Sequence, residues 1–436
     1  LTLQELLNMS DTIKIGIAGL GTVGAGLIKI IQKNSKILAA RSGKSIEIIA
    51  VSALSKSKDR GVDLSAYEWE NDPVNLAKRD DIDVFVELIG GEDGHAKQAT
   101  EAAIKHGKHV VTANKAMLAM YGQELAISAE SNNVNLRFEA AVAGGIPVIK
   151  ALTESLAGNN ITRIMGVMNG TCNYILTRME DTGLPYEEIF EEANLLGFLE
   201  ADPNLDVGGI DAAHKLVLLS SIAYGTQVDF EGAVLEGIGR ISIEDIRAAS
   251  EMGYRIKLLG VSTINKLGLS QTMRPCLVPA SSPLAQLDGG TNMIIIEGDA
   301  VGQIVLRGAG AGEGPTASAV IADILDIARG INIPVFGQPA NSLKKVPSIN
   351  TTVENSFYLR LNLKDEAGIL AKVSAALANA GISIDRIRQE VHETDAAPVI
   401  IVTHPTERDL LNKAIAEIEA TSAAIDPPVV LRIETV

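Results

Sequence analysis

The stretch TIKIGIAGLGTVGAGLIKIIQ, residues 12–32, decides the fold of the first part of the chain. It opens with a strand-like run in which Ile13, Ile15 and Ile17 lead directly into glycines. From residue 25 to 32 the apolar residues fall on one face of a helix. A strand, a glycine-rich turn and a helix in this order are typical of the opening unit of a doubly wound sheet.

The turn itself follows the spacing G-x-G-x-x-G, which occurs where a protein holds a dinucleotide. Gly19 permits the tight turn, Gly21 lets the backbone approach a pyrophosphate, and Gly24 lets the helix pack on the strand. The free N–H groups of the helix N-terminus favour an anion there. The alternative is a glycine turn without ligand. We expect the cofactor to contact the whole loop: Gly19, Leu20, Gly21, Thr22, Val23 and Gly24.

Strand-like and helical segments continue to alternate after this unit. Strands are expected at 46–54, 83–90 and 108–114, and a helix at 96–106 that Gly107 can end in a left-handed conformation. This alternation predicts a parallel sheet with helices on both faces. We expect a dinucleotide-binding domain over residues 1–135, with a return segment at about 310–340.

The loop after the second strand bears on which cofactor is bound. NAD sites usually carry an acid here, but residues 52–58 read SALSKSK, with Lys56 and Lys58 and then Arg60. Cations favour the extra phosphate of NADP, and we include Lys56 among the expected cofactor ligands. The same lysines could form a solvated loop, so NAD remains possible.

Two further parts are expected downstream. Residues 136–310 read as an α+β domain for substrate binding, catalysis and dimerisation, with an antiparallel sheet at about 253–304. A polar linker at 341–355 precedes a βαββαβ unit at 356–436. Its first strand, SFYLRLNL, alternates and is predicted to be half-buried. Its first helix, 368–380, should bury one face made by Ile369, Leu370, Val373 and Leu377.

Composition excludes several classes of partner. The chain has 38 basic and 54 acidic residues, a formal net charge of −16, which argues against nucleic acid and anionic membranes. No apolar run reaches the roughly 18–20 residues of a membrane span. Cys172 and Cys276 lie far apart without metal-like spacing, and a reducing cytoplasm is the expected location.

The most informative segment runs from Ala193 to Lys215, where acids surround Pro203 and paired glycines before a helix begins. Asp211 and Lys215 are four residues apart and therefore share a helix face. The following turns are apolar, so this pair is expected in a polar pocket of a buried helix and not in a surface ion pair. Asn114 and Lys115 follow a predicted strand end, where open α/β sheets bind ligands. For Lys115 the alternative is a surface lysine at a helix start.

Together these motifs resemble the homoserine dehydrogenase family across essentially the whole chain. The resemblance rests on Ala193-x-x-x-Gly197-Phe198, Asp202-Pro203-x-x-Asp206-Val207 and Asp211-x-x-x-Lys215. Four more matching motifs are ELIGG (87–91), TANKA (112–116), NGT-x-NYIL (169–176) and GAGAG-x-x-PTASAV (308–320). The βαββαβ tail is similar to the ACT domain of many bacterial members.

The resemblance implies the reversible NAD(P)-dependent interconversion of L-homoserine and L-aspartate 4-semialdehyde. Lys215 and Lys115 would act on the reacting group, as acid, base or electrostatic clamp, with Asp211 positioning Lys215. The substrate would be held by Glu200, Asp206, Gly170, Thr171 and Lys115, and the cofactor also approached by Asn114, Lys115 and Gly312.

The resemblance also implies a sodium-like monovalent cation at Glu139, Val142, Gly144 and Ile146. Threonine is the expected effector at residues 365–370 of the tail, and a homo-oligomer, dimer or tetramer, is the expected assembly. Family members often carry an arginine near residue 53 or 54, where this chain is apolar, so the choice between NADP and NAD stays open.

Two other functions remain to be weighed. A semialdehyde dehydrogenase acting through a thioester would need Cys172 or Cys276 as nucleophile, and neither has a histidine nearby in the sequence. A non-catalytic NAD(P)-binding sensor with an ACT ligand switch would leave the pair of Asp211 and Lys215 without a chemical role.

Overall fold

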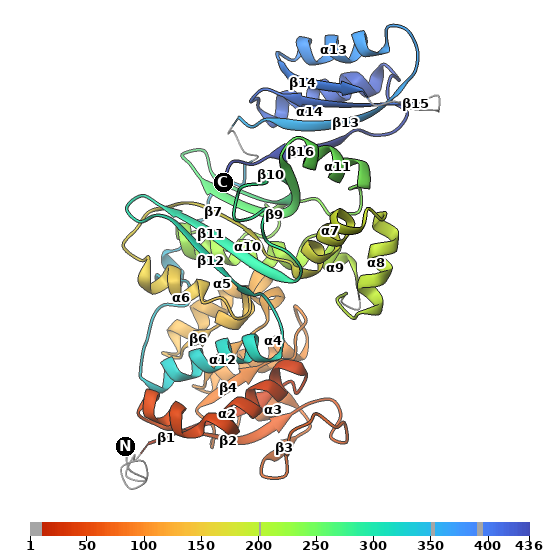
Figure 1. Cartoon of the computed structure of the whole chain (residues 1–436). Coiled ribbons are helices and arrows are strands. Elements are labelled where there is room, and N and C mark those ends of the chain that lie inside the picture. Colours follow the sequence, from red (N-terminus) through yellow and green to blue (C-terminus); the bar gives the residue numbers. More distant parts are fainter. Residues whose placement is uncertain (1–10, 200–201, 350–353, 390–395) are drawn as a thin grey trace.

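The computed structural model describes residues 11–199, 202–349, 354–389 and 396–436. Its three parts follow one another along the molecule, from a sheet with flanking helices at the N-terminus to a small sheet with two helices near the C-terminus (Figure 1). None of the helices in these ranges is long and apolar enough to cross a membrane.

The N-terminal part contains a six-stranded parallel sheet in the order β3-β2-β1-β4-β5-β6. This confirms the predicted doubly wound sheet. The three strands that follow β1 at the expected places are slightly shorter than predicted, while the edge strands β3 and β6 were not predicted. The strands are β1 (Thr12–Ala18), β2 (Ser45–Ser52), β3 (Glu68–Glu70), β4 (Val84–Glu87), β5 (His109–Thr112) and β6 (Leu136–Arg137).

Helices cover both faces of this sheet: α2 (Thr22–Ser42), α3 (Pro73–Ala77), α4 (His95–Lys105), α5 (Lys115–Ser131) and α12 (Glu313–Ala328). Helix α2 continues ten residues past the predicted end at residue 32, until Gly43 turns left-handed at φ 76°. Its polar stretch after residue 32 faces solvent, so the apolar pattern used to predict the helix fades before the helix ends. Gly107, at φ 70°, adopts the predicted left-handed conformation after α4. Helix α12 returns from the central part and packs beside α2.

The central part is built on antiparallel strands in the order β12-β11-β7-β9-β10, as predicted for residues 253–304. These are β7 (Ile161–Val167), β9 (Tyr254–Ile264), β10 (Leu269–Pro279), β11 (Thr291–Gly298) and β12 (Gly302–Ala309), with β8 (Val234–Leu235) beside β10. The helices are α6 (Val148–Lys150), α7 (Gly170–Thr182), α8 (Tyr186–Leu195), α9 (Asn204–Val207), α10 (Ile210–Tyr224) and α11 (Ile243–Glu251). Helix α10 lies against β9 and β10 and is buried along most of its length.

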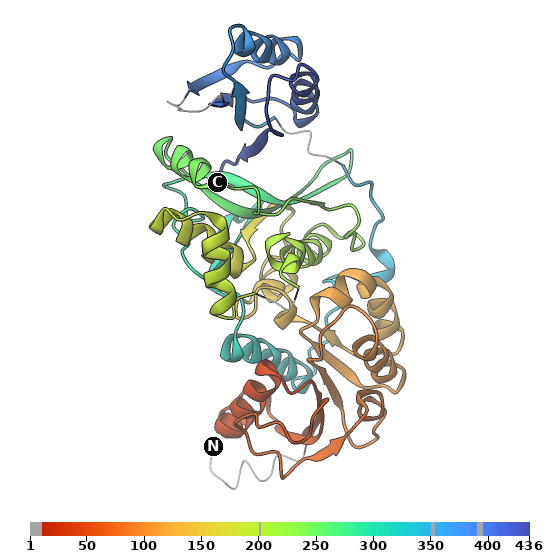
Figure 2. The ribbon, with the colours of Figure 1, turned by 90° about the vertical axis from the view of Figure 1, so that its right-hand side faces the viewer.

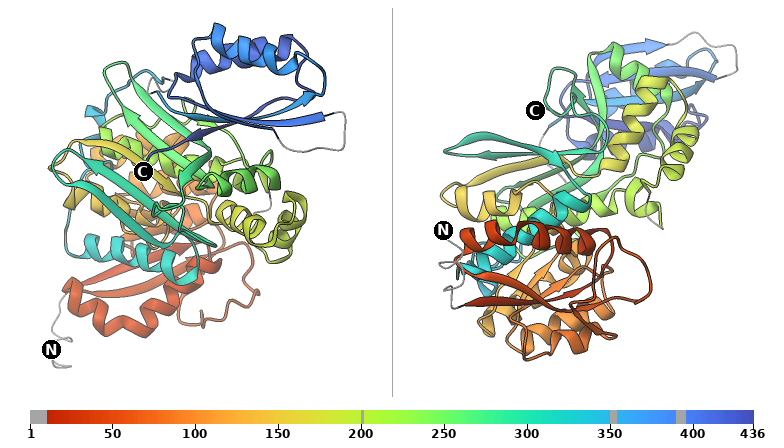
Figure 3. Two further views of the ribbon diagram at one scale, coloured as in Figure 1. Left: turned by 45° about the horizontal axis from the view of Figure 1, so that its top comes forward. Right: turned by 60° about the horizontal axis from the view of Figure 1, so that its bottom comes forward.

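The C-terminal part confirms the βαββαβ order: β13 (Phe357–Lys364), α13 (Ile369–Asn379), β14 (Ile384–Gln389), β15 (Ala396–Thr403), α14 (Arg408–Ala420) and β16 (Val429–Ile433). The two helices lie side by side on one face of the strands (Figure 3). The last strand, β16, pairs with β13 on one side and with β10 of the central part on the other. A continuous sheet therefore runs through both parts, and β16 reaches down into the central one (Figure 2).

Two local expectations for the C-terminal region were wrong. Strand β13 is not half-exposed, because Tyr358 is fully buried and its hydroxyl donates to Asp245 of α11 at 2.8 Å. Leu370 is 37% exposed, and Ala376 takes its place on the buried face of α13. The polar segment before this part contacts the central part, because bridges join Lys344 to Thr226 and Ser348 to Leu269.

Candidate active site

The glycine-rich turn has the geometry that a bound pyrophosphate requires. Gly19 has φ 96°, and a Cβ there would lie 2.2 Å from the carbonyl oxygen of Leu88. A Cβ on Gly24 would lie 2.2 Å from the carbonyl oxygen of Gly19, whereas one on Gly21 would meet no atom within 4 Å. Two glycines therefore close the turn, and the third leaves open space in front of the N-terminus of α2.

A groove of about 720 Å³ extends from this turn along the ends of β1, β2 and β4. Lys58 and Arg60 line it, and Lys56 does not; the Lys56 ammonium lies 6.0 Å above the ring of Trp69. Arg60 is anchored by donating to the carbonyl oxygens of Leu20 at 2.9 Å, Lys58 at 2.7 Å and Ser55 at 2.5 Å. The groove thus presents a cationic wall and no acid at the end of β2.

A second cavity, of about 560 Å³, lies where the N-terminal and central parts meet. Its walls bring together segments that are distant in the sequence, including the starts of α2, α5, α7, α10 and α12. Among the predicted site residues it is lined by Val23, Lys115, Gly144, Gly170, Thr171, Asp206, Asp211, Lys215 and Gly312. Glu200 lies outside the described residues.

One carboxylate in this cavity joins both lysines. Asp211 Oδ2 accepts from Lys215 Nζ at 2.7 Å, and Asp211 Oδ1 lies 2.9 Å from Lys115 Nζ. Lys215 is only 8% exposed, and its Nζ also donates to the carbonyl oxygen of Met168 at 2.8 Å. The prediction of a buried helix carrying a paired lysine is confirmed.

The charges of this triad act on each other. Burial alone would raise the pKa of Asp211, but the ammonium groups of Lys215 and Lys115 hold that pKa well below its usual range. Asp211 therefore remains an anion and is the shared counter-ion of both lysines. This arrangement keeps two ammonium donors beside one carboxylate in the cavity.

Asn169 is the residue that sequence reasoning missed. Its Oδ1 caps α7 by accepting from the backbone N–H of Cys172 at 2.8 Å, and its Nδ2 donates to Asp206 at 2.9 Å and to Asp211 at 3.3 Å. The signal was present, because an asparagine before a helix start is a preferred N-cap. The contact with both acids was not predictable, since it joins residues about forty positions apart.

The next predicted site residues are Gly170, Thr171, Gly312 and Asn114. The Thr171 hydroxyl donates to the carbonyl oxygen of Phe198 at 2.9 Å, and a Cβ on Gly170 would lie 2.6 Å from the carbonyl oxygen of Gly290. Gly312 precedes the N-terminus of α12. The Asn114 side chain caps α5 through Met117 N and donates to the carbonyl oxygen of Gly91 at 2.7 Å, and Asn114 lines neither cavity.

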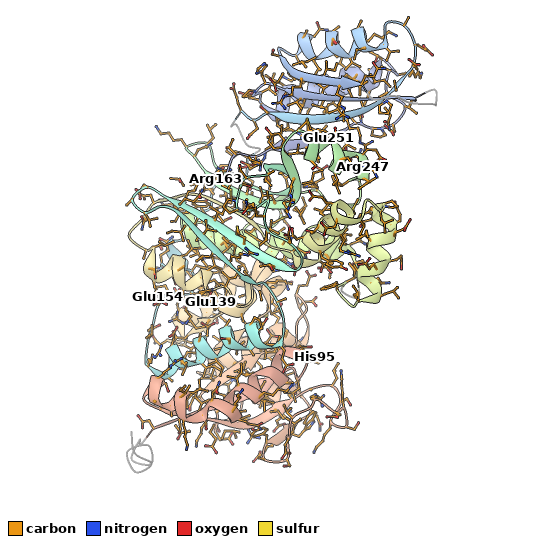
Figure 4. All side chains as sticks on the ribbon, in the orientation of Figure 1. His95, Glu139, Glu154, Arg163, Arg247 and Glu251 are labelled. Atoms are coloured by element: carbon orange, nitrogen blue, oxygen red, sulfur yellow. The ribbon has the colours of Figure 1, made fainter. Side chains whose placement is uncertain are left out.

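The loop predicted to hold a cation borders the same cavity. Glu139 (labelled in Figure 4) is buried and accepts from the backbone N–H groups of Ile149 at 3.0 Å and Lys150 at 2.8 Å. Burial, with the negative charge of Asp323, raises the pKa of Glu139 to about 8. Gly144, at φ 53°, packs so closely on the GAGAG loop that a Cβ would lie 2.5 Å from the carbonyl oxygen of Gly310. Val142 and Ile146 lie in the same turn and are fully or nearly buried.

The cysteine chemistry of a semialdehyde dehydrogenase is not supported. Cys172 is fully buried, and its Sγ donates to the carbonyl oxygen of Asp206 at 3.2 Å. Burial and the acids Asp206 and Asp211 raise the pKa of this thiol well above its usual value. Burial likewise raises the pKa of Cys276. Neither sulfur is a thiolate nucleophile.

Comparison with known proteins agrees with this site. Residues 147–325 match the homoserine dehydrogenase family, residues 19–139 the NAD-binding domain of homoserine dehydrogenase, and residues 357–422 the ACT domain. The homoserine dehydrogenase of Neisseria gonorrhoeae is 43% identical, over 97% of this chain and 99% of the relative. That of Pseudomonas aeruginosa is 41% identical over the same shares.

Solved structures agree as well. The homoserine dehydrogenase from Thiobacillus denitrificans has a TM-score of 0.92 at 39% identity, covering 98% of this chain and 99% of that one. A hyperthermophilic archaeal homoserine dehydrogenase in complex with NADPH has a TM-score of 0.64 at 27% identity, covering 74% and 99%. The chain therefore belongs to the homoserine dehydrogenase family, whose members are NAD(P)-dependent oxidoreductases of amino-acid biosynthesis.

Proposed function

We propose that the triad of Asp211, Lys215 and Lys115 carries the proton chemistry of the reaction between L-homoserine and L-aspartate 4-semialdehyde. The observation behind this proposal is the single carboxylate that joins both lysines in the cavity between the two domains. A nicotinamide cofactor, when bound, exchanges a hydride with the substrate carbon. The chain itself must then bind the substrate, exclude water and manage the hydroxyl proton.

Lys215 is suited to transfer the hydroxyl proton of the substrate. Its ammonium uses two N–H groups on Asp211 and on the Met168 carbonyl oxygen. The third N–H is available to the oxygen of the substrate, where it stabilises an alkoxide or donates the proton during reduction. Because its Nζ is held by the Asp211 carboxylate, Lys215 is proposed to act mainly as acid and electrostatic clamp.

Substrate recognition falls to the neighbouring acids. Asp206, 5% exposed, is oriented by Asn169 and lines the cavity. We propose that it binds the substrate ammonium together with Glu200, while Gly170 and Thr171 shape the wall. In this proposal one polar end of the substrate lies at α9 and the reacting end at Lys215.

The cofactor is proposed to be NADP, with NAD as an alternative. Support comes from the cationic wall of Lys58 and Arg60 and from the NADPH complex of the archaeal relative. Lys56 remains a candidate ligand on the same loop, as do Asn114 and Lys115 near the nicotinamide and Gly312 near the pyrophosphate.

A sodium-like cation is proposed at Glu139 and the main-chain carbonyls of Val142, Gly144 and Ile146. A buried carboxylate beside Asp323 fits a cation, because it is held by only two backbone N–H groups in the described structure. A cation there would supply positive charge next to the loop that approaches the cofactor.

The remaining parts of the proposal concern assembly and regulation. We propose a homo-oligomer formed through the central domain, threonine as effector at the 365–370 turn, and a cytoplasmic location consistent with two buried, unpaired cysteines. The proposed domain limits are 1–135 with 310–340, 136–310 and 356–436, joined by the linker 341–355.

The test of the proposed chemistry is turnover of homoserine with each cofactor by the wild type and Lys215→Ala. We expect turnover to fall about 100-fold or more in the variant, the usual effect of losing an acid–base group, while NADPH binding persists. Lys97→Ala, which removes a lysine paired with Glu101 on the surface of α4, is the matched control. Near wild-type turnover in Lys215→Ala would remove the assignment.

A further inference from the structure

A separate basic cavity lies where the ACT domain meets the central domain. It measures about 390 Å³ and shares no lining residue with the active site or the cofactor groove. Its walls come from β8 and the loop after it, from β10 and from the first turns of α14. The lining residues are Val234, Leu235, Glu236, Arg240, Thr272, Arg274, Arg408 and Asn412. We call it the arginine cavity.

The charges of the arginine cavity are unbalanced. Three arginines, Arg240, Arg274 and Arg408, line it together with a single acid, Glu236. Within the described ranges none of these arginines forms an ion pair, whereas most arginines of the chain do. An excess of guanidinium groups over carboxylates is the usual composition of an oxyanion site.

Two guanidinium N–H groups of the cavity arginines have no hydrogen-bond acceptor in the described part of the chain. Nε of Arg274 and Nη1 of Arg408 are buried and lack a hydrogen-bond acceptor within the described part of the chain. A buried donor left without an acceptor destabilises the fold, and more so when it belongs to a charged group. An oxygen-bearing anion in the cavity would offset the positive charge of both groups.

The side chains are nevertheless held in place by neutral partners. Arg408 Nε donates to Asn412 Oδ1 at 3.1 Å, and its guanidinium lies 5.6 Å from the ring of Phe357. Arg240 Nη2 donates to the carbonyl oxygens of Pro427 and Pro428, both at 3.3 Å. Arg240 and Arg408 are therefore oriented in advance without being neutralised, which lowers the ordering cost of binding a ligand.

The electrostatics agree with this geometry. Burial lowers the pKa of Arg408, and the charge of Arg274 lowers it further. Burial also lowers the pKa of Arg274, with Arg432 adding repulsion. Arg432 is 4% exposed, and its own charge is engaged by Glu434 at 2.5 Å. The acid near Arg274 and Arg408 is Glu236, and it forms no ion pair with either arginine in the described part of the chain.

We propose that the arginine cavity binds a small ligand through a phosphate or carboxylate group, at the junction of the ACT and central domains. The site differs from the 365–370 turn and does not depend on the proposed triad chemistry. Backbone hydrogen bonds also link the arginine cavity to the active site. Glu236 N donates to the Met273 carbonyl oxygen at 2.8 Å, and Ile238 N donates to that of Val207, the neighbour of Asp206, at 2.9 Å.

The experiment uses the full-length chain saturated with NADPH, so that the cofactor groove is filled. Sodium phosphate and sodium succinate are titrated separately at constant ionic strength, with calorimetry and the melting temperature as readouts. The variants are Arg274→Gln and Arg408→Gln. Arg247→Gln is the matched control, because Arg247 (labelled in Figure 4) is exposed on α11 and does not line the cavity.

We expect saturable binding and a higher melting temperature with at least one anion in the wild type and in Arg247→Gln. Each cavity variant should bind about tenfold more weakly or worse, which corresponds to one lost charged hydrogen bond. Arg408→Lys, which keeps the charge but loses the planar fork, should bind with intermediate affinity and guards against a folding defect. Comparing the two anions identifies the preferred group. No saturable binding of either anion, or unchanged affinity in both glutamine variants, would overturn the proposal.

Discussion

At the scale of single residues, Asp211 is the group that joins both lysines of the candidate site. Because two lysines depress its pKa, the stability that it contributes is present above the ordinary pKa of an unfolded aspartate, about 4, and is lost as the pH falls below that value. We expect Asp211→Asn to lower the free energy of unfolding at neutral pH by about 3 kcal/mol, since two ammonium groups lose their shared partner.

Urea unfolding at several pH values measures this effect. The difference between wild type and Asp211→Asn should stay constant from neutral to mildly acidic pH and shrink below about pH 4. Asp288→Asn, at an exposed pair with Arg255, should change stability by only a few tenths of a kcal/mol. A difference that grows on acidification would contradict the charge assignment.

The cofactor loop allows a second test at this scale. Lys58 lines the groove while Lys56 lies over Trp69, so Lys58→Ala should lower kcat/KM for NADPH about tenfold and leave the value for NADH nearly unchanged. Lys56→Ala, measured in parallel, shows which lysine meets the extra phosphate. Equal losses with both cofactors in Lys58→Ala would mean that the lysine does not read that phosphate.

Sequence reasoning reached part of this site. The spacing of Asp211 and Lys215 follows from helix geometry, and the strand-end rule placed Lys115 near the ligand. The bridge between Lys115 and Asp211 could not be predicted, because it joins two domains across a cavity. The same holds for the Lys215 contact with the Met168 carbonyl oxygen, which depends on how β7 packs against α10.

At the scale of elements, the contact between α11 and β13 explains why Tyr358 is buried. Asp245, fully buried, caps α11 with Ser242 and accepts from Tyr358 and from Arg360 Nε at 2.7 Å. Alternation in SFYLRLNL indicates which residues share a face, but not whether a neighbouring domain covers the second face. Here Asp245 of α11 covers that second face. The capping pattern of Ser242 and Asp245 alone would predict only a local role for this acid.

This contact predicts a difference between two arginines that cross the same domain boundary. Arg360→Gln should lower the free energy of unfolding by about 2–4 kcal/mol, because it leaves the buried Asp245 without its cation. Arg388→Gln removes a partner of the exposed Glu251 (labelled in Figure 4) and should cost less than about 1 kcal/mol. Chemical denaturation of both variants measures the contrast, and equal effects would show that burial of Asp245 does not matter.

At the scale of the whole molecule, β16 joins the sheet of the ACT domain to that of the central domain. The βαββαβ pattern predicted an ACT-like unit, yet nothing in VVLRIETV indicates that its strand would pair with β10. Such pairing depends on the position of one folded domain on another. Deleting the tail would remove β16 and expose the edge of β10. A truncated enzyme would therefore differ from the intact one in its central sheet as well as in the effector site.

A point variant is therefore the sharper test of threonine as effector. The turn at 365–368 is exposed and precedes the N-terminus of α13, where free N–H groups can hold a carboxylate and an acid can hold an ammonium.

We expect threonine at millimolar concentration to inhibit the intact enzyme. Glu366→Gln should weaken that inhibition about tenfold and leave the uninhibited rate unchanged, since the turn lies outside the active site. Glu417→Gln, on the second ACT helix, is the control with the same change of charge. If threonine does not inhibit, or inhibits both variants as strongly as the wild type, the turn is not the sensor and inhibition must be sought elsewhere in the molecule.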